Sequence, residues 1–146
     1  MKKLTFKIDI DAKPKKVWDT MIDPVTYKEW TNVSWPDSYF EGEWKQGANL
    51  KFLSNEGGGT LANIVEFKPY EFILAKHIAV INNDRTEDRD SDTAKGWIGT
   101  LESYRFTEKN GKTKLSTEMN INPEWESMFA DSWPKAMAKL KEVCER

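Results

Sequence analysis

The sequence predicts an α+β fold in which a curved antiparallel sheet of about six or seven strands wraps around one long C-terminal helix. Two short helices are expected after the first strand. Three observations predict this arrangement: alternating apolar residues near the N-terminus, a run of short strand-like segments joined by turn residues, and a final stretch with apolar residues at helical spacing. The length of 146 residues suits one domain, 1–146, built on a single hydrophobic core.

The N-terminal part predicts one strand followed by two short helices. Apolar side chains occupy every second position of the first segment, namely Leu4, Phe6, Ile8 and Ile10. Pro14 is a good first residue for a helix, and the Asp23-Pro24 pair ends that helix. We expect a second short helix that carries Tyr27 and Trp30.

The middle of the sequence predicts an antiparallel meander, because its strand-like segments follow one another with short turns. These segments read "ANLKFLS", "TLANIVEF", "YEFILAKHIAVI", "WIGTLESYRFTE" and "KTKLSTEMNI", and glycine or proline residues separate most of them. Residues 82–95 are almost wholly polar and predict a long, mobile connection. Such a loop is either simply solvated or a gate over a binding site.

The C-terminal stretch predicts one long helix that is kinked at a proline. Asn122 and Pro123 give a start signal for this helix. The apolar stripe stays in phase through Pro134, which two independent helices would have no reason to do. The alternative is a break at Asp131-Ser132 followed by a second helix.

Strand periodicity predicts which side chains face the helix. In residues 71–81 we favour the register that turns Lys76 outward and His77 inward, although the opposite register would bury Lys76. In the next strand, Glu102 and Tyr104 should face inward together with Phe106. Met119 should do the same in the last strand.

A helix lying on a curved sheet can leave space that side chains do not fill, and this space is the candidate site for a small molecule. The expected cavity residues are mostly aromatic, with a few polar groups: Trp18, Trp30, Tyr39, His77, Trp97, Glu102, Tyr104, Met119, Trp125, Phe129 and Trp133. The alternative assigns several of them, Trp18 and Phe129 among them, to an ordinary core, and His77 to a hydrogen-bonded interior position.

Composition argues against several other functions. A single histidine and a single cysteine, Cys144, cannot build a thiolate or imidazole metal cage, so we expect neither metal nor cofactor. The net charge of −2 argues against a nucleic-acid partner, and no segment is apolar enough for membrane insertion. The N-terminus lacks the apolar block of a signal peptide, and we therefore expect a cytoplasmic protein.

Several motifs together resemble one known superfamily. The segment "KPKKVWDTMIDPVTYKEW" is similar to the opening of the START/Bet v 1-like helix-grip superfamily, also called SRPBCC. The segments "SYFEGEWKQGANLKF", "GGGTLANIVEFKPYEFILAKH" and "WPKAMAKLKE" continue the resemblance in order, and it is closest to the branch named after the activator of heat-shock protein ATPase.

This resemblance implies a cavity between helix and sheet, and it leaves three functional hypotheses. The first is a non-enzymatic module that binds a hydrophobic small-molecule ligand. The second is an enzyme that acts on such a ligand by acid–base catalysis through Glu102, Tyr104 and His77. The third is a co-chaperone-like module with a chaperone or other protein partner, for which exposed aromatic surface around Trp35 and Trp44 would argue. The true activators that this chain resembles carry an additional N-terminal domain, so we expect ligand binding rather than chaperone activation.

Overall fold

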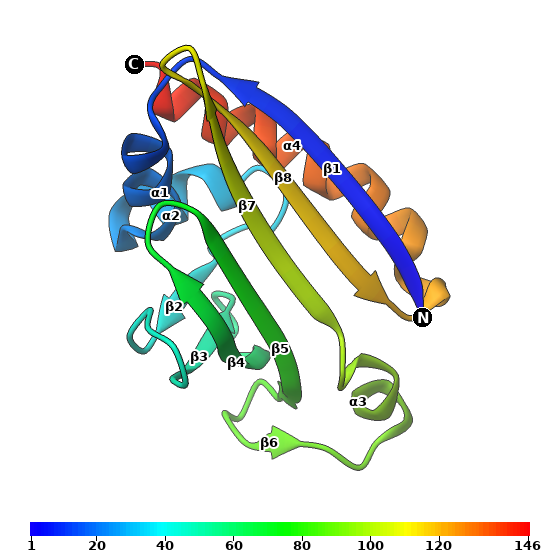
Figure 1. Ribbon diagram of the computed structural model, residues 1–146. Coiled ribbons are helices and arrows are strands. Elements are labelled where there is room, and N and C mark those ends of the chain that lie inside the picture. Colours follow the sequence, from blue (N-terminus) through cyan, green and yellow to red (C-terminus); the bar gives the residue numbers. More distant parts are fainter.

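A computed structural model describes all residues, 1–146, and confirms the α+β fold with a long C-terminal helix (Figure 1). In chain order the elements are β1 (Lys2–Ile10), α1 (Pro14–Ile22), α2 (Pro24–Thr31), β2 (Tyr39–Glu41), β3 (Asn49–Leu53), β4 (Gly59–Lys68), β5 (Phe72–Ile81), β6 (Glu87–Asp88), α3 (Asp92–Trp97), β7 (Leu101–Lys109), β8 (Lys112–Ile121), the 3-10 helix η1 (Pro123–Trp125) and α4 (Glu126–Cys144).

All strands belong to one antiparallel sheet of eight strands with the order β1-β8-β7-β5-β4-β3-β2. The two-residue strand β6 lies off this order and pairs with β5. Strand β1 closes the meander by pairing with β8 from Lys2↔Ile121 to Ile10↔Thr113. The sheet therefore has two more short strands, β2 and β6, than the strongest sequence signals indicate.

Helix α4 runs alongside β1 and contacts α1 and α2 as well (Figure 1). It is continuous through Pro134, so the predicted single helix is confirmed and the alternative break at Asp131-Ser132 is wrong. The predicted start signal belongs to the 3-10 helix η1, because the Asn122 side chain accepts a hydrogen bond from the backbone N–H of Glu124, and α4 itself begins at Glu126. The helix turns its apolar stripe, including Trp133 and Leu140, into the core.

The two short helices after β1 are confirmed with the predicted boundary. The Asp23 carboxylate accepts hydrogen bonds from the backbone N–H groups of Val25 and Thr26, which caps α2. Because Asp23 also ends α1, the chain turns sharply there, and Trp30 of α2 is brought beneath α4 next to Trp133.

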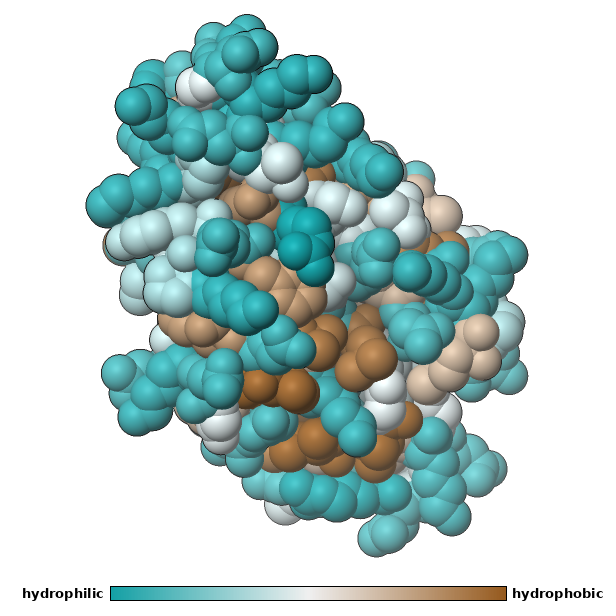
Figure 2. All heavy atoms as spheres, viewed as in Figure 1, coloured by the Kyte–Doolittle hydropathy of each residue, from teal (hydrophilic) through white to brown (hydrophobic).

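The strand faces are confirmed. In β5, His77 is 2% exposed whereas Lys76 points to solvent. Tyr104 of β7 and Met119 of β8 are buried on the same inner face. The opposite face, seen in Figure 2, is mostly hydrophilic, with some hydrophobic side chains gathered over β5 and β7.

The prediction for residues 82–97 needs a correction. The segment expected to be a mobile loop contains β6 and most of α3, and Trp97, expected at the start of a strand, is the last residue of α3. Ser91 caps this helix by accepting from the backbone N–H of Ala94, and Gly99, with a φ of +94°, turns the chain into β7. Trp97 is therefore placed by a helix that folds back against β5.

The main core lies between α1, α2, α4 and the inner face of the sheet, and two smaller clusters lie along β3, β4 and β5. None of the helices combines the length and the apolar character needed to cross a membrane.

Candidate functional site

A pocket with a volume of about 550 Å³ lies beneath the first half of α4. The sheet supplies one wall from β3, β4, β5 and β7, and the opposite wall comes from α2, η1 and α4. The short helix α3 contributes Thr93 and Trp97. Fourteen of the 23 lining residues are hydrophobic, so the space is largely apolar.

Tryptophan dominates the walls. Six of the seven tryptophans of the chain line the pocket, namely Trp30, Trp35, Trp44, Trp97, Trp125 and Trp133. Neighbouring rings hold one another at fixed angles: Trp35 meets Trp133 edge-on with centroids 5.0 Å apart, and Trp97 stacks on Phe129 at 5.9 Å. Such contacts give the pocket rigid walls.

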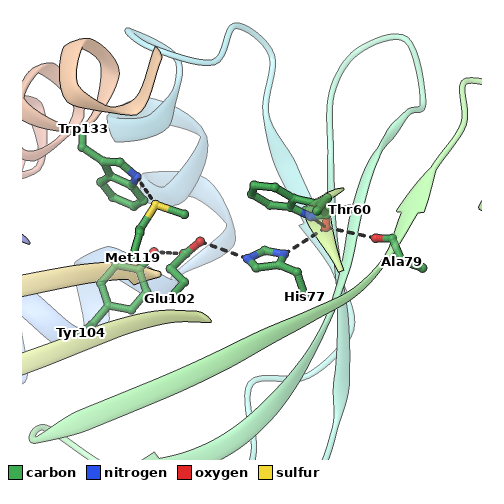
Figure 3. A network of polar contacts seen from close by, with 8 residues as sticks. Thr60, His77, Ala79, Glu102, Tyr104, Met119 and Trp133 are labelled. Carbon is green, nitrogen blue, oxygen red and sulfur yellow. Dashed lines mark hydrogen bonds and ion pairs between the residues drawn. The ribbon is translucent and has the colours of Figure 1, made fainter. Parts of the chain in front are cut away.

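Four polar side chains of the pocket, Thr60, His77, Glu102 and Tyr104, form one connected chain of hydrogen bonds (Figure 3). His77 Nε2 lies 3.1 Å from Glu102 Oε1, and His77 Nδ1 lies 2.9 Å from the hydroxyl of Thr60. The Tyr104 hydroxyl donates to the other oxygen of Glu102. These groups lie on β4, β5 and β7, which explains why distant parts of the sequence converge here.

Thr60 is the second hydrogen-bond partner of the His77 ring. Its hydroxyl oxygen accepts from Trp97 Nε1 at 2.7 Å, and its own proton can go either to His77 Nδ1 or to the backbone oxygen of Ala79 at 3.2 Å. In the first case a neutral His77 donates from Nε2 to Glu102. In the second case the Thr60 hydroxyl oxygen is free to accept a hydrogen bond from Nδ1 instead.

Burial keeps the two phenols of the pocket neutral. Loss of solvation raises the pKa of Tyr104 well above its ordinary value, and the nearby Glu102 raises it further. The same two causes, in the same order, raise the pKa of Tyr27. Both phenols therefore stay protonated at physiological pH, and the Tyr104 hydroxyl donates to Glu102.

Glycine permits the close approach of β3 and β4 that positions Thr60. A Cβ atom at Gly59 would lie 1.8 Å from the backbone oxygen of Phe52, which no side chain could tolerate. The Gly57-Gly58-Gly59 run, which by sequence resembles only a flexible turn, therefore ends in a residue that the adjacent strand requires.

The pocket brings together eight of the eleven residues predicted for the cavity: Trp30, His77, Trp97, Glu102, Tyr104, Trp125, Phe129 and Trp133. The other three lie elsewhere, which corrects their expected position. Trp18 packs in the core against Phe67 and Phe106, with ring centroids 5.0 and 5.3 Å away.

Tyr39 and Met119 also do not line the pocket. Tyr39 lies on the edge strand β2, where its hydroxyl accepts a hydrogen bond from Arg85 at 3.3 Å. Met119 lies behind the pocket wall, and its sulfur accepts the indole N–H of Trp133 at 2.8 Å. Met119 therefore holds a lining residue without lining the space itself.

Sequence reasoning missed some lining residues. Tyr27 is one helical turn before Trp30, and this spacing could have placed both rings on one face. Thr60 follows the glycine run at the start of an apolar strand, but nothing in the sequence shows that it would meet His77. Exposed aromatic surface around Trp35 and Trp44 would have argued for a protein partner, but both residues pack against the core and line the pocket.

The pocket has the chemistry of hydrogen bonding and proton transfer. Glu102 accepts two hydrogen bonds, lines the pocket and has a side chain that is 14% exposed. His77 and Tyr104 lie directly behind it. A bound molecule could exchange a hydrogen bond, or a proton, with this group.

The fold and the pocket define the class of protein: an α+β helix-grip fold with a long helix packed over an antiparallel sheet. Residues 11–145 match the family described as "Activator of Hsp90 ATPase homolog 1-like protein", and the chain belongs to this family. Family and fold agree with a ligand-binding or co-chaperone-like domain. A comparison with curated protein sequences gave no significant match.

Solved structures share the fold at low sequence identity. The solution structure of the Aha1 dimer from Colwellia psychrerythraea is 18% identical, with a TM-score of 0.75 over 99% of this chain and 97% of that chain. A crystal structure of a protein from Mesorhizobium loti is 13% identical, with a TM-score of 0.76 over 97% and 96%. The crystal structure of CalU16 from Micromonospora echinospora is 16% identical, with a TM-score of 0.66 over 97% and 73%.

Proposed function

We propose that the chain binds a hydrophobic small molecule in the pocket beneath α4. The observation that supports this most strongly is the convergence of six tryptophans on an open space of about 550 Å³, which is within the usual size range of ligand pockets. A protein that needed these side chains only for its core would close the space, because burying apolar surface stabilises the fold.

Binding can be tested with Nile red, a neutral dye whose emission changes in apolar surroundings. We expect saturable binding and a change in tryptophan fluorescence. Trp35→Ala removes a partly exposed wall and should weaken the affinity at least about fivefold, because a large apolar contact is lost. Trp18→Phe is the matched control, since Trp18 is buried outside the pocket. Absence of saturable binding in a folded protein would refute the proposal.

A co-chaperone-like role is the second candidate, and family membership favours it. Addition of the purified protein to an Hsp90 ATPase assay tests this role directly. Stimulation of ATP hydrolysis that persists in a variant with an impaired pocket would favour the co-chaperone function over ligand binding.

Catalysis on the bound molecule is a third candidate, which the Glu102–His77–Tyr104 chain favours. Consumption of a bound ligand that stops in Glu102→Gln, with binding retained, would support it. We also propose that residues 1–146 form one domain in the cytoplasm, since sheet and helices share one main core and Cys144 is free.

A further inference from the structure

The pocket lining of 23 residues contains one acidic side chain, Glu102, and no lysine or arginine. The other group that can carry a charge is His77, and both of its nitrogens are already engaged, one by Glu102 and one by Thr60. A ligand carboxylate or phosphate would therefore find no free cationic group and would lie near a carboxylate.

The hydrogen-bonding capacity of Glu102 also favours a cationic ligand over an anionic one. A carboxylate offers about four acceptor sites, and here Tyr104 and His77 occupy two of them. The side chain is partly accessible, so the remaining sites can accept hydrogen bonds from a bound molecule. A ligand that donates a hydrogen bond to Glu102 would use these sites. A positively charged donor would form the strongest hydrogen bond there, because the surroundings are apolar.

The aromatic walls also favour a cation. Three of the lining indoles direct their N–H groups to protein acceptors: Trp30 to Met21, Trp97 to Thr60 and Trp133 to Met119. Trp35 and Trp125 are partly exposed and line the pocket, so a ligand can reach their rings. Indole faces attract cations, and the attraction is strongest where water is excluded.

We propose that the pocket selects an organic cation: a protonated amine, attached to an apolar or aromatic body, that donates to Glu102 between tryptophan walls. This inference rests on the proposed function, and it names the class of ligand. It distinguishes the pocket from one that takes fatty acids or other organic anions, for which a lining lysine or arginine would be needed.

Three probes with one apolar body test the inference: phenylbutylamine, phenylbutanol and phenylbutyrate. At neutral pH they are cationic, neutral and anionic, and each competes with Nile red. We expect the amine to bind at least about tenfold more tightly than the alcohol, and the anion to bind most weakly. In Glu102→Gln the amine should lose most of this advantage, whereas the affinity for the alcohol should change less than about threefold.

The possible outcomes are distinct. Equal binding of amine and alcohol, or a preference for phenylbutyrate, would overturn the cation inference while leaving the ligand-binding function intact. Failure of all three probes and of Nile red would overturn both. If Glu102→Gln does not fold, the ranking of the three probes on the unmodified protein still decides the matter.

Discussion

At the scale of single residues, the Tyr104 hydroxyl is the best place to measure what the buried polar chain contributes to stability. It donates to Glu102 in a site that water barely reaches. Tyr104→Phe leaves the ring and removes only this bond, so we expect the free energy of unfolding to fall by about 1–3 kcal/mol in urea titrations. Tyr70→Phe is the matched control because Tyr70 is 41% exposed, and its effect should stay below about 0.5 kcal/mol. An equal effect of both changes would contradict the structure.

The buried phenols of Tyr104 and Tyr27 also predict how the free energy of unfolding depends on pH in the alkaline range. The pKa of both Tyr27 and Tyr104 is raised above the ordinary value of 10.0, first by burial and then by Glu102. Above pH 10 the unfolded chain releases phenolic protons that the folded chain keeps, so rising pH favours unfolding. Each tyrosine should lower the free energy of unfolding by up to about 1.4 kcal/mol per pH unit. Below pH 10 this contribution is constant.

The measurement is a series of urea titrations from neutral to alkaline pH. Above pH 10, the free energy of unfolding should fall less steeply with pH in Tyr104→Phe, by the contribution of one tyrosine. Tyr27→Phe should have the same effect. If neither change alters the slope, the two phenols titrate normally and are not enclosed as the structure describes.

At the scale of elements, Pro134 is an exposed residue inside α4, where proline removes one backbone hydrogen bond. Pro134→Ala should restore that bond and raise the free energy of unfolding by about 1–3 kcal/mol, measured by thermal or urea unfolding. Lys135→Ala, at the next exposed position, is the control and should change it by less than about 0.5 kcal/mol. A loss of stability in Pro134→Ala would show instead that α4 needs the proline to lie correctly over the sheet.

Elements with strong periodicity could be predicted from the sequence, whereas short elements could not. Strand β5 alternates clearly, and burying Lys76 would have been costly, so its register followed from elementary physics. Helix α3 has only six residues and lies within a polar segment, where the hydrophobic pattern carries little information. Its signals were local: Ser91 as a cap and Gly99 at a positive φ. Without α3, Trp97 was assigned to a strand.

In the candidate site, too, some residues could be predicted from the sequence and others could not. The inward orientation of residues on long strands, such as Glu102 and Tyr104, could be predicted because side chains alternate between the two faces of a strand. The meeting of Thr60 with His77 depends on a register shift between β4 and β5 at Leu61/Ala62. A bulge changes which residues face each other, and the sequence around it gives no sign of its position.

At the scale of the whole molecule, filling the pocket should stabilise one end of the fold more than the other. Helix α3 borders the pocket through Thr93 and Trp97, whereas the outer edge of β1 lies away from it. Amide hydrogen exchange should therefore slow on residues 82–100 when Nile red binds, and change little on β1, because binding stabilises only the conformations that hold the ligand. The same comparison in Trp35→Ala, at equal dye concentration, should show a smaller effect. If hydrogen exchange slows equally in all elements, the dye stabilises the protein globally. If exchange on residues 82–100 does not slow, this segment neither covers nor gates the pocket.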